Sequence, residues 1–227
     1  MEFKLSPTSI SLMKECSRCF WLDKHGIWKR PQGIFPSLPS GMDRILKKHF
    51  DFYRDIDKLP PELCENGHCE NMKLFGSNNG EKEILDIWRN ARKGVFFEDK
   101  DGNILQGAVD NILVKNGKLI VLDYKTRGYA LKEFTHKYYQ DQLDIYSFLL
   151  EKNGYDVENF AFLLFYVPNH ITETGEFVFD TTLLKLDVDL SNAEYLFSKA
   201  LKILNSSCPD EKCVWCELVD FEDKNLY

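Results

Sequence analysis

The sequence contains no apolar run that approaches the roughly 18 residues a membrane-spanning helix requires. Its start, Met1-Glu2-Phe3-Lys4, lacks the charged and apolar segments of a secretory signal peptide. We find no internal repeat and no low-complexity segment in the chain. These absences argue against membrane, secreted and repeat proteins, and we expect a cytoplasmic protein with no membrane partner.

The sequence also lacks an excess of basic residues, because its formal net charge is −7. This balance argues against a protein that coats nucleic acid through bulk charge. It does not exclude an enzyme that acts on phosphodiesters, since an acidic metal site and a local basic groove can coexist. With 227 residues and 44% hydrophobic side chains, the chain is long and apolar enough for one globular domain.

The chain has seven cysteines, an odd number that does not favour a disulfide framework in an intracellular setting. Four of them form two C-x-x-C pairs at opposite ends of the chain, Cys16 with Cys19 and Cys213 with Cys216. Each pair suits two ligands of a tetrahedral metal, and both pairs complete a four-thiolate set if the termini meet. Zinc is favoured by this symmetry, and unligated thiols are the alternative.

The hydrophobic pattern predicts an α/β fold with a mixed central β-sheet flanked by helices. We expect a single domain over 1–227, made of a helical N-terminal part, a core, and a C-terminal helix with a cysteine cluster, at about 6–91, 94–170 and 192–220. Predicted helices cover about 6–23, 42–59, 81–91, 134–153 and 192–204. Predicted strands cover 95–97, 104–114, 118–125, 160–166 and 177–187, and the proline-rich residues 30–41 are predicted to form a loop.

The dipeptide Asn116-Gly117 is typical of a two-residue type I′ hairpin turn, which fixes the register of the flanking strands. Counting outward from the turn, Asn111 pairs with Leu122, and the next pair is Asp110 with Asp123. Directly opposed side chains lie about 4.5–5.5 Å apart at Cβ on the same face. Lys125, two residues further along, shares that face.

Two opposed carboxylates repel each other, and a bound Mg²⁺ or Mn²⁺ removes this conflict. The rest of the hairpin is apolar on both faces, which is typical of central strands covered by helices on both sides. The pattern therefore predicts a metal site at the end of a buried hairpin. The alternative is that the strands fray there and the charged groups simply face water.

Three short motifs carry a resemblance to a known family. Gly107-Ala108-Val109-Asp110, then Asp123-Tyr124-Lys125, resembles the G-x-x-D and (D/E)-x-K motifs of the PD-(D/E)XK nuclease superfamily, which has a restriction-endonuclease-like core. Gln142 and Tyr146 match the Q-x-x-x-Y motif of its RecB-like branch, which includes helicase–nuclease repair enzymes and CRISPR-associated exonucleases. The resemblance is firmest over residues 104–150. Taken alone, the last motif could equally reflect core packing of Tyr146.

The resemblance implies that Asp110, Asp123 and the backbone carbonyl of Tyr124 hold the catalytic Mg²⁺ or Mn²⁺. Lys125 would orient the attacking water and stabilise the anionic transition state, and Gln142 and Tyr146 would position DNA or the catalytic groups.

The family often adds a metal-binding histidine in a G-x-x-x-H setting. Here Gly41 is followed at that spacing by Ile45, and the nearest histidine is His49. His49 is therefore either a metal ligand reached from a different turn or an ordinary surface or core histidine.

Several RecB-like nucleases hold a [4Fe–4S] cluster with one N-terminal and three C-terminal cysteines. By that resemblance Cys208 could replace Cys19 as the fourth ligand, which gives Cys16, Cys208, Cys213 and Cys216. The residues alone leave both ligand sets, and iron–sulfur or zinc, open.

The sequence as a whole predicts a metal-dependent DNA nuclease acting on single strands or DNA ends in repair, recombination or defence. A helicase or other repair or defence protein is an expected partner, since the chain carries no helicase P-loop. A non-catalytic nucleic-acid-binding module of the same fold is the first alternative. A cysteine-ligated scaffolding protein is the second.

Overall fold

The computed structural model describes residues 2–217 except 32, 34–35, 66 and 78–79. The helices are α1 (Pro7–Glu15), α2 (Ser17–Lys24), α3 (Ser37–Asp55), α4 (Pro61–Cys64), α5 (Glu81–Trp88), the 3₁₀ helix η1 (Thr135–Tyr139), α6 (Gln140–Lys152) and α7 (Leu190–Leu204). The strands are β1 (Lys4–Leu5), β2 (Lys73–Leu74), β3 (Val95–Glu98), β4 (Ile104–Gly107), β5 (Asn111–Lys115), β6 (Lys118–Thr126), β7 (Phe160–Ile171) and β8 (Phe177–Asp187).

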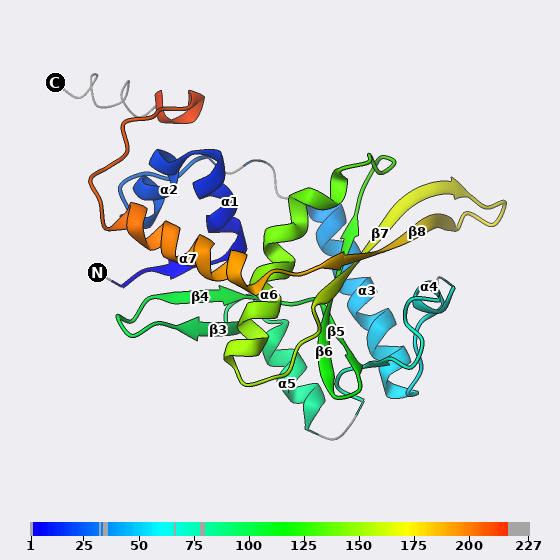
Figure 1. The fold of residues 1–227 in the computed structure, drawn as a ribbon. Helices are drawn as coiled ribbons and strands as arrows, with labels where there is room; N and C mark the ends of the chain where they lie inside the picture. Colours follow the sequence, from blue (N-terminus) through cyan, green and yellow to red (C-terminus); the bar gives the residue numbers. More distant parts are fainter. Residues whose placement is uncertain (1, 32, 34–35, 66, 78–79, 218–227) are drawn as a thin grey trace.

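These strands form two mixed sheets, which confirms the predicted α/β class with helices flanking mixed β-structure (Figure 1). The larger sheet has the order β2-β5-β6-β7-β8, with β6 and β7 parallel and its other pairs antiparallel. The smaller sheet has the order β1-β4-β3. Helix α6 contacts β3 and β4 of the smaller sheet as well as β6 of the larger one, and so joins the two.

The larger sheet is covered on both faces. On one face, Leu46 and Phe50 of α3 pack with the hairpin residues Leu113 and Ile120 in one apolar cluster. On the other face, a larger cluster includes residues of α1, α5, α6 and α7 together with Ile112 and Val121. Because both faces are buried, any charged group within this hairpin needs a partner or a ligand.

The predicted hairpin register is confirmed. Lys115 pairs with Lys118 at the turn, and Asn111 pairs with Leu122 at the far end of the ladder. Asn116 and Gly117 have φ angles of +51° and +83°, the left-handed values that a type I′ turn demands. The ladder stops at Asn111, one residue short of Asp110.

The prediction of one continuous strand over 104–114 was wrong. The segment forms two strands in different sheets, because β4 pairs with β1 and β3 while β5 pairs with β2 and β6. The link between them includes Val109, whose N–H donates to the Trp88 carbonyl at 3.1 Å. This break lets Asp110 enter the hairpin from outside the ladder.

The first predicted helix, about 6–23, is interrupted at Cys16. This residue has an extended backbone with φ −161°, so that it ends α1 and caps α2. Helix α3 begins at Ser37, five residues before the predicted start, because Pro39 lies in its first turn, where a missing N–H costs no helical hydrogen bond. Part of the predicted 30–41 loop, residues 32 and 34–35, falls outside the described residues.

Two other boundaries differ. Strand β7 continues through Pro168 to Ile171, because a register irregularity between Pro168 and His170 accommodates the missing N–H. The predicted helix over 134–153 begins with the 3₁₀ turn η1 before α6. The two-residue strands β1 and β2 were not predicted, since their pairing depends on tertiary contacts.

The two ends of the described chain lie together. In Figure 1, α1 and α2 lie beside α7, and the C-terminal helical turn at 214–217 lies near α2. The fold therefore brings the N-terminal and C-terminal cysteine pairs to one side of the molecule.

Candidate metal-dependent active site

Asp110 and Asp123 meet where the hairpin leaves its ladder. Oδ2 of Asp110 accepts a long hydrogen bond of 3.4 Å from the backbone N–H of Tyr124, the neighbour of Asp123. The Asp123 side chain is almost fully buried, at 1% exposed, whereas the Asp110 side chain keeps 19% of its surface exposed. One carboxylate is thus enclosed in the core, and the other opens toward solvent.

Lys125 lies on the same face of β6 as Asp123. Its Nζ is 2.7 Å from Oδ2 of Asp123 and 5.2 Å from the centre of the Tyr139 ring. Burial lowers the pKa of Lys125, but the charges of Asp123 and Asp110 outweigh this effect and leave the pKa raised. Lys125 therefore stays cationic next to the two carboxylates.

Burial and the negative charge of Asp123 raise the pKa of Asp110 to about 8. The protein alone therefore does not hold both carboxylates ionised at neutral pH, even with Lys125 and Lys47 nearby. A divalent cation between them would restore the ionised state, and carboxylate oxygens are the donors that Mg²⁺ and Mn²⁺ prefer. The donor set fits such an ion.

Helix α3 contributes a polar stripe to this site, which sequence reasoning missed. Lys47 Nζ lies 4.0 Å from Oδ1 of Asp110 and 2.9 Å from Oδ2 of Asp43, one helical turn earlier. The negative charge of Asp43 adds to the rise in the Asp110 pKa. The i, i+4, i+8 spacing of Asp43, Lys47 and Asp51 was a visible signal, but only the docking of α3 shows which site the stripe faces.

His49 lies on a different side of α3. Its Nε2 is 2.8 Å from Oε1 of Glu62, and the same oxygen accepts a 2.6 Å hydrogen bond from the Tyr166 hydroxyl. Within the described residues, Lys47 rather than His49 is the α3 side chain that forms an ion pair with Asp110.

Two buried arginines stand behind the carboxylates, and sequence reasoning missed them as well. Arg54 and Arg89 both donate to Oδ1 of Asn111, at 2.6 and 2.5 Å, and both pair with Oδ1 of Asp51. Burial and the charge of Arg89 lower the pKa of Arg54 to about 10, so it remains cationic at neutral pH. Two cations share one carboxylate, which leaves a positive charge beside the acidic pair.

The same arginines fix the backbone. Nε of Arg89 donates to the carbonyl of Asp110 at 2.8 Å, and Nε of Arg54 donates to the carbonyl of Phe75 at 2.7 Å. Asp110 lies outside the strand ladder, so Arg89 supplies a hydrogen bond where the sheet does not. We conclude that this network positions Asp110.

Gln142 and Tyr146 lie one turn apart on α6, and Nε2 of Gln142 donates to the Tyr146 hydroxyl at 2.7 Å. Burial, followed by the charge of Asp123, raises the pKa of Tyr146, so the phenol stays neutral next to the carboxylates. A Cβ on Gly107 would come within 2.4 Å of the Tyr146 ring, which explains the glycine at this position.

A cavity of about 760 Å³ opens beside this pair of residues. Its lining includes Gln142, Tyr146 and Gly107, together with Lys24 from α2 and Tyr138 from η1. The cavity therefore connects the Q-x-x-x-Y residues to the surface.

Tyr124 contributes its backbone to the carboxylate site and its side chain to the opposite core. Its ring stacks on Phe50 at 5.6 Å between centroids, and its N–H reaches Asp110. Its hydroxyl is buried without a hydrogen-bond partner among the described residues. The alternation of β6 thus places Asp123 and Lys125 toward α6 and the Tyr124 ring toward α3.

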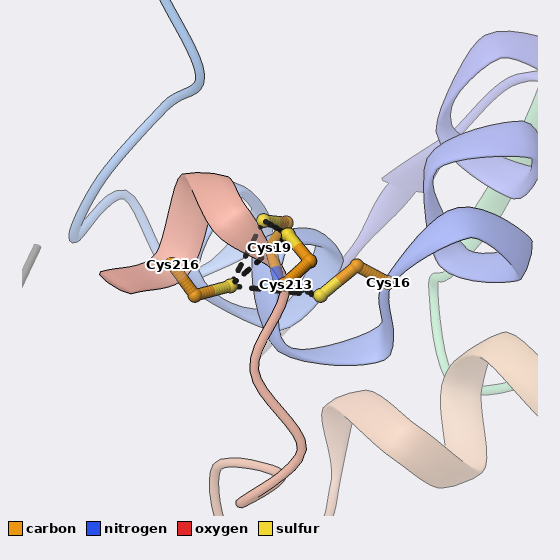
Figure 2. Close-up of side chains that lie close together, drawn as sticks. All are labelled: Cys16, Cys19, Cys213 and Cys216. Carbon is orange, nitrogen blue, oxygen red and sulfur yellow. Dashed lines mark hydrogen bonds between the residues drawn. The ribbon is translucent and has the colours of Figure 1, made fainter. Parts of the chain in front are cut away.

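The four C-x-x-C cysteines come together (Figure 2). The sulfur of Cys19 lies 3.0 Å from that of Cys216 and 3.5 Å from that of Cys213, and Cys16 and Cys216 are 3.5 Å apart. All four sulfurs lie within 4.8 Å of one another. This set could hold a metal ion.

Cys208 is not in this group, which argues against its alternative role. Its sulfur accepts a 3.4 Å hydrogen bond from Arg18 instead. Arg30 donates to the sulfur of Cys213 at 3.7 Å. Burial raises the pKa of Cys213, but the N–H groups of Cys216 and Trp215 outweigh it and lower that pKa to about 6, a value suited to a thiolate ligand.

Comparison with known proteins identifies the family. A model described as the PD-(D/E)XK nuclease superfamily matches residues 77–220, which is more than half of the chain. The chain belongs to the PD-(D/E)XK nuclease superfamily. The motifs around Asp110, Asp123 and Lys125 lie inside the matched region, and the predicted resemblance is confirmed.

This PD-(D/E)XK chain also has curated relatives. An ATP-dependent helicase/nuclease subunit of Clostridium botulinum, in strains ATCC 19397 and Langeland, is 25% identical over 147 residues, or 59% of this chain. The chain spans only 11% of the length of these relatives. The relatives and the superfamily together support a nuclease-type function, and nucleases of this superfamily use divalent metals. Among its described residues, no helix is both long and apolar enough to cross a membrane.

Proposed function

We propose that this protein is a divalent-metal-dependent nuclease that hydrolyses phosphodiester bonds of DNA, on single strands or at ends. The observation that carries the proposal is the meeting of Asp110, Asp123 and Lys125 at the end of one buried hairpin. Membership in the PD-(D/E)XK superfamily supports it. Residues 1–227 would act as one nuclease domain.

Asp110, Asp123 and the carbonyl of Tyr124 would hold Mg²⁺ or Mn²⁺. When bound, the ion lowers the pKa of a water molecule and neutralises charge on the scissile phosphate. Lys125, kept cationic by the two carboxylates, orients the attacking water and stabilises the additional negative charge of the transition state. Gln142 and Tyr146 position the substrate or the carboxylates from α6.

Cleavage of labelled single- and double-stranded DNA with Mg²⁺ or Mn²⁺ tests this proposal. We expect Asp110→Ala and Lys125→Ala each to reduce the rate by at least about 100-fold while circular dichroism stays native. Undiminished cleavage by both purified variants would reject the assignment. DNA binding by the wild type without any cleavage would instead identify a non-catalytic module of the same fold, and neither activity would favour a scaffold.

At the cysteines we propose one Zn²⁺ held by Cys16, Cys19, Cys213 and Cys216. Zinc–thiolate bonds of about 2.3 Å place the sulfurs of a tetrahedral site about 3.8 Å apart, close to the 3.0–3.8 Å contacts found here. A [4Fe–4S] cluster inserts iron and sulfide between the thiolates and separates them further. Metal analysis and visible absorbance of anaerobically purified protein decide between one zinc and four irons per chain.

We further propose that the protein works in repair, recombination or defence with a helicase partner. Its support is the name of the relatives, which combines helicase and nuclease in one polypeptide. Co-purification with a helicase encoded beside it, and stimulation of cleavage by ATP in the mixture, tests this partner. Equal cleavage with and without the helicase and ATP would reject it.

A further inference from the structure

The segment that joins β6 to α6, residues 127–139, carries the two most exposed large apolar side chains of the described chain. Tyr129 is 83% exposed and Tyr138 is 84% exposed, and Phe134 in the same segment is 54% exposed. Folding alone does not explain aromatic rings held in water. We call residues 127–139 the aromatic segment.

The aromatic segment is also basic within an acidic protein. It contains Arg127, Lys132 and Lys137 against a single acidic residue, Glu133, whereas the whole chain has a net charge of −7. Nε of Arg127 has no hydrogen-bond partner among the described residues. Aromatic rings interleaved with basic groups are typical of surfaces that bind single-stranded nucleic acid, because the rings stack on bases and the cations pair with phosphates.

The aromatic segment is continuous with the carboxylate site. It starts two residues after Lys125, and its last residue, Tyr139, has its ring 5.2 Å from Lys125 Nζ. Tyr138 lines the same cavity as Gln142 and Tyr146. A strand lying on this segment would therefore lead toward the carboxylates.

The three exposed rings are not equivalent. Lys137 Nζ lies 4.3 Å from the centre of the Phe134 ring, so one face of that ring already has a partner. No such cation is found over Tyr129 or Tyr138 among the described residues. Their faces are therefore the ones available to a base.

We propose that Tyr129 and Tyr138 are base-stacking residues that make this protein select single-stranded over double-stranded DNA. In a duplex each base is already stacked on its neighbours, so only an unpaired strand offers base faces to these rings. Arg127 and Lys132 contact the phosphates. This inference rests on the proposed nuclease function for its substrate class, but it concerns binding rather than cleavage.

Binding is measured by fluorescence anisotropy with a labelled oligothymidylate and a matched duplex, in the Asp110→Asn background without divalent metal. We expect Tyr129→Ala and Tyr138→Ala each to raise the single-strand Kd by about 10-fold, and the double variant by about 100-fold. Duplex Kd should change less than about 2-fold. Tyr→Phe at either position should retain affinity, since phenylalanine also stacks.

Tyr195→Ala is the matched control, because Tyr195 is 59% exposed on α7 and also has a lysine, Lys199, over its ring at 5.8 Å. Equal single-strand affinity of the double variant and this control would overturn the inference, whether or not the wild type cleaves DNA. A selective loss of single-strand binding, in a protein that cleaves nothing, would uphold it and reject the nuclease proposal. In the active enzyme, the substitutions should raise KM and leave kcat unchanged.

Discussion

The molecule has two clusters of metal-ligating side chains, and they are built in opposite ways. The carboxylate site is local, because Asp110 and Asp123 come from adjacent strands of one hairpin. The cysteine site is global, because Cys16 and Cys216 are separated by 200 positions and meet only when both ends of the chain are folded. The first arrangement suits chemistry that needs fixed geometry, and the second suits a clamp that holds the fold closed.

Replacing Cys19 by serine should separate the two sites with the largest effect. A metal that closes a loop of nearly 200 residues removes chain entropy worth about 5 kcal/mol, so Cys19→Ser should lose the bound metal and most of that stability. Urea unfolding with metal analysis measures both. Cys208→Ser, outside the four-cysteine group, should change stability by less than about 1 kcal/mol. Equal metal loss in the two variants would contradict the ligand set.

Replacing Arg89 by alanine should weaken the carboxylate site from behind. The change removes the donor to the Asp110 carbonyl and leaves Asn111 and Asp51 with one arginine each, at a cost of about 2–4 kcal/mol. Mn²⁺ affinity should fall as well, because Asp110 is no longer positioned. Arg92→Ala, at an exposed side chain, is the control. Native stability and Mn²⁺ affinity in Arg89→Ala would rule out the positioning role.

Replacing Gly107 by alanine should have a smaller effect through packing. The new Cβ would lie 2.4 Å from the Tyr146 ring, and the ring must shift at a cost of about 1–3 kcal/mol. Cleavage should slow, and Tyr146→Leu in the same chain should recover stability but not activity. Gly41→Ala, with open space around its Cβ, should not destabilise. A Gly107→Ala variant with full activity would show that the Tyr146 position is not needed.

Replacing His49 by alanine should have the smallest effect. His49 is bonded to Glu62 at a partly exposed position, so we expect a loss of about 1 kcal/mol in stability and less than about 2-fold in cleavage rate. Stability is measured by urea unfolding and the rate at saturating Mg²⁺. A 10-fold or larger loss of rate would instead make His49 a metal ligand.

Sequence patterns predicted most of the local site. The Asn116-Gly117 turn determined the register, and from it the proximity of Asp110 and Asp123, because hairpin geometry depends on only a few adjacent residues. The two C-x-x-C pairs likewise predicted the cysteine group, although only the folded termini distinguish Cys19 from Cys208.

What could not be predicted depends on how elements dock. The apolar run from Ile104 to Val114 has the pattern of one strand, and nothing local shows that its halves join different sheets. Lys47 and Arg89 reach Asp110 from α3 and from the end of α5, whose positions are determined by packing across the whole domain. A polar stripe on a helix indicates a site, but not which one.

The most direct test of the carboxylate site is calorimetric titration of Mn²⁺ into the protein at pH 7, in two buffers of different ionisation enthalpy. The Asp110 pKa is raised to about 8 without metal, so most molecules carry a proton there that the ion must displace. We predict release of about one proton per ion bound at pH 7, weaker binding at lower pH, and release of almost none at pH 9.5. The Asp110→Asn variant should lose both the binding and the proton release. Unchanged Mn²⁺ binding by Asp110→Asn would contradict the assignment of Asp110 and Asp123 as the metal site.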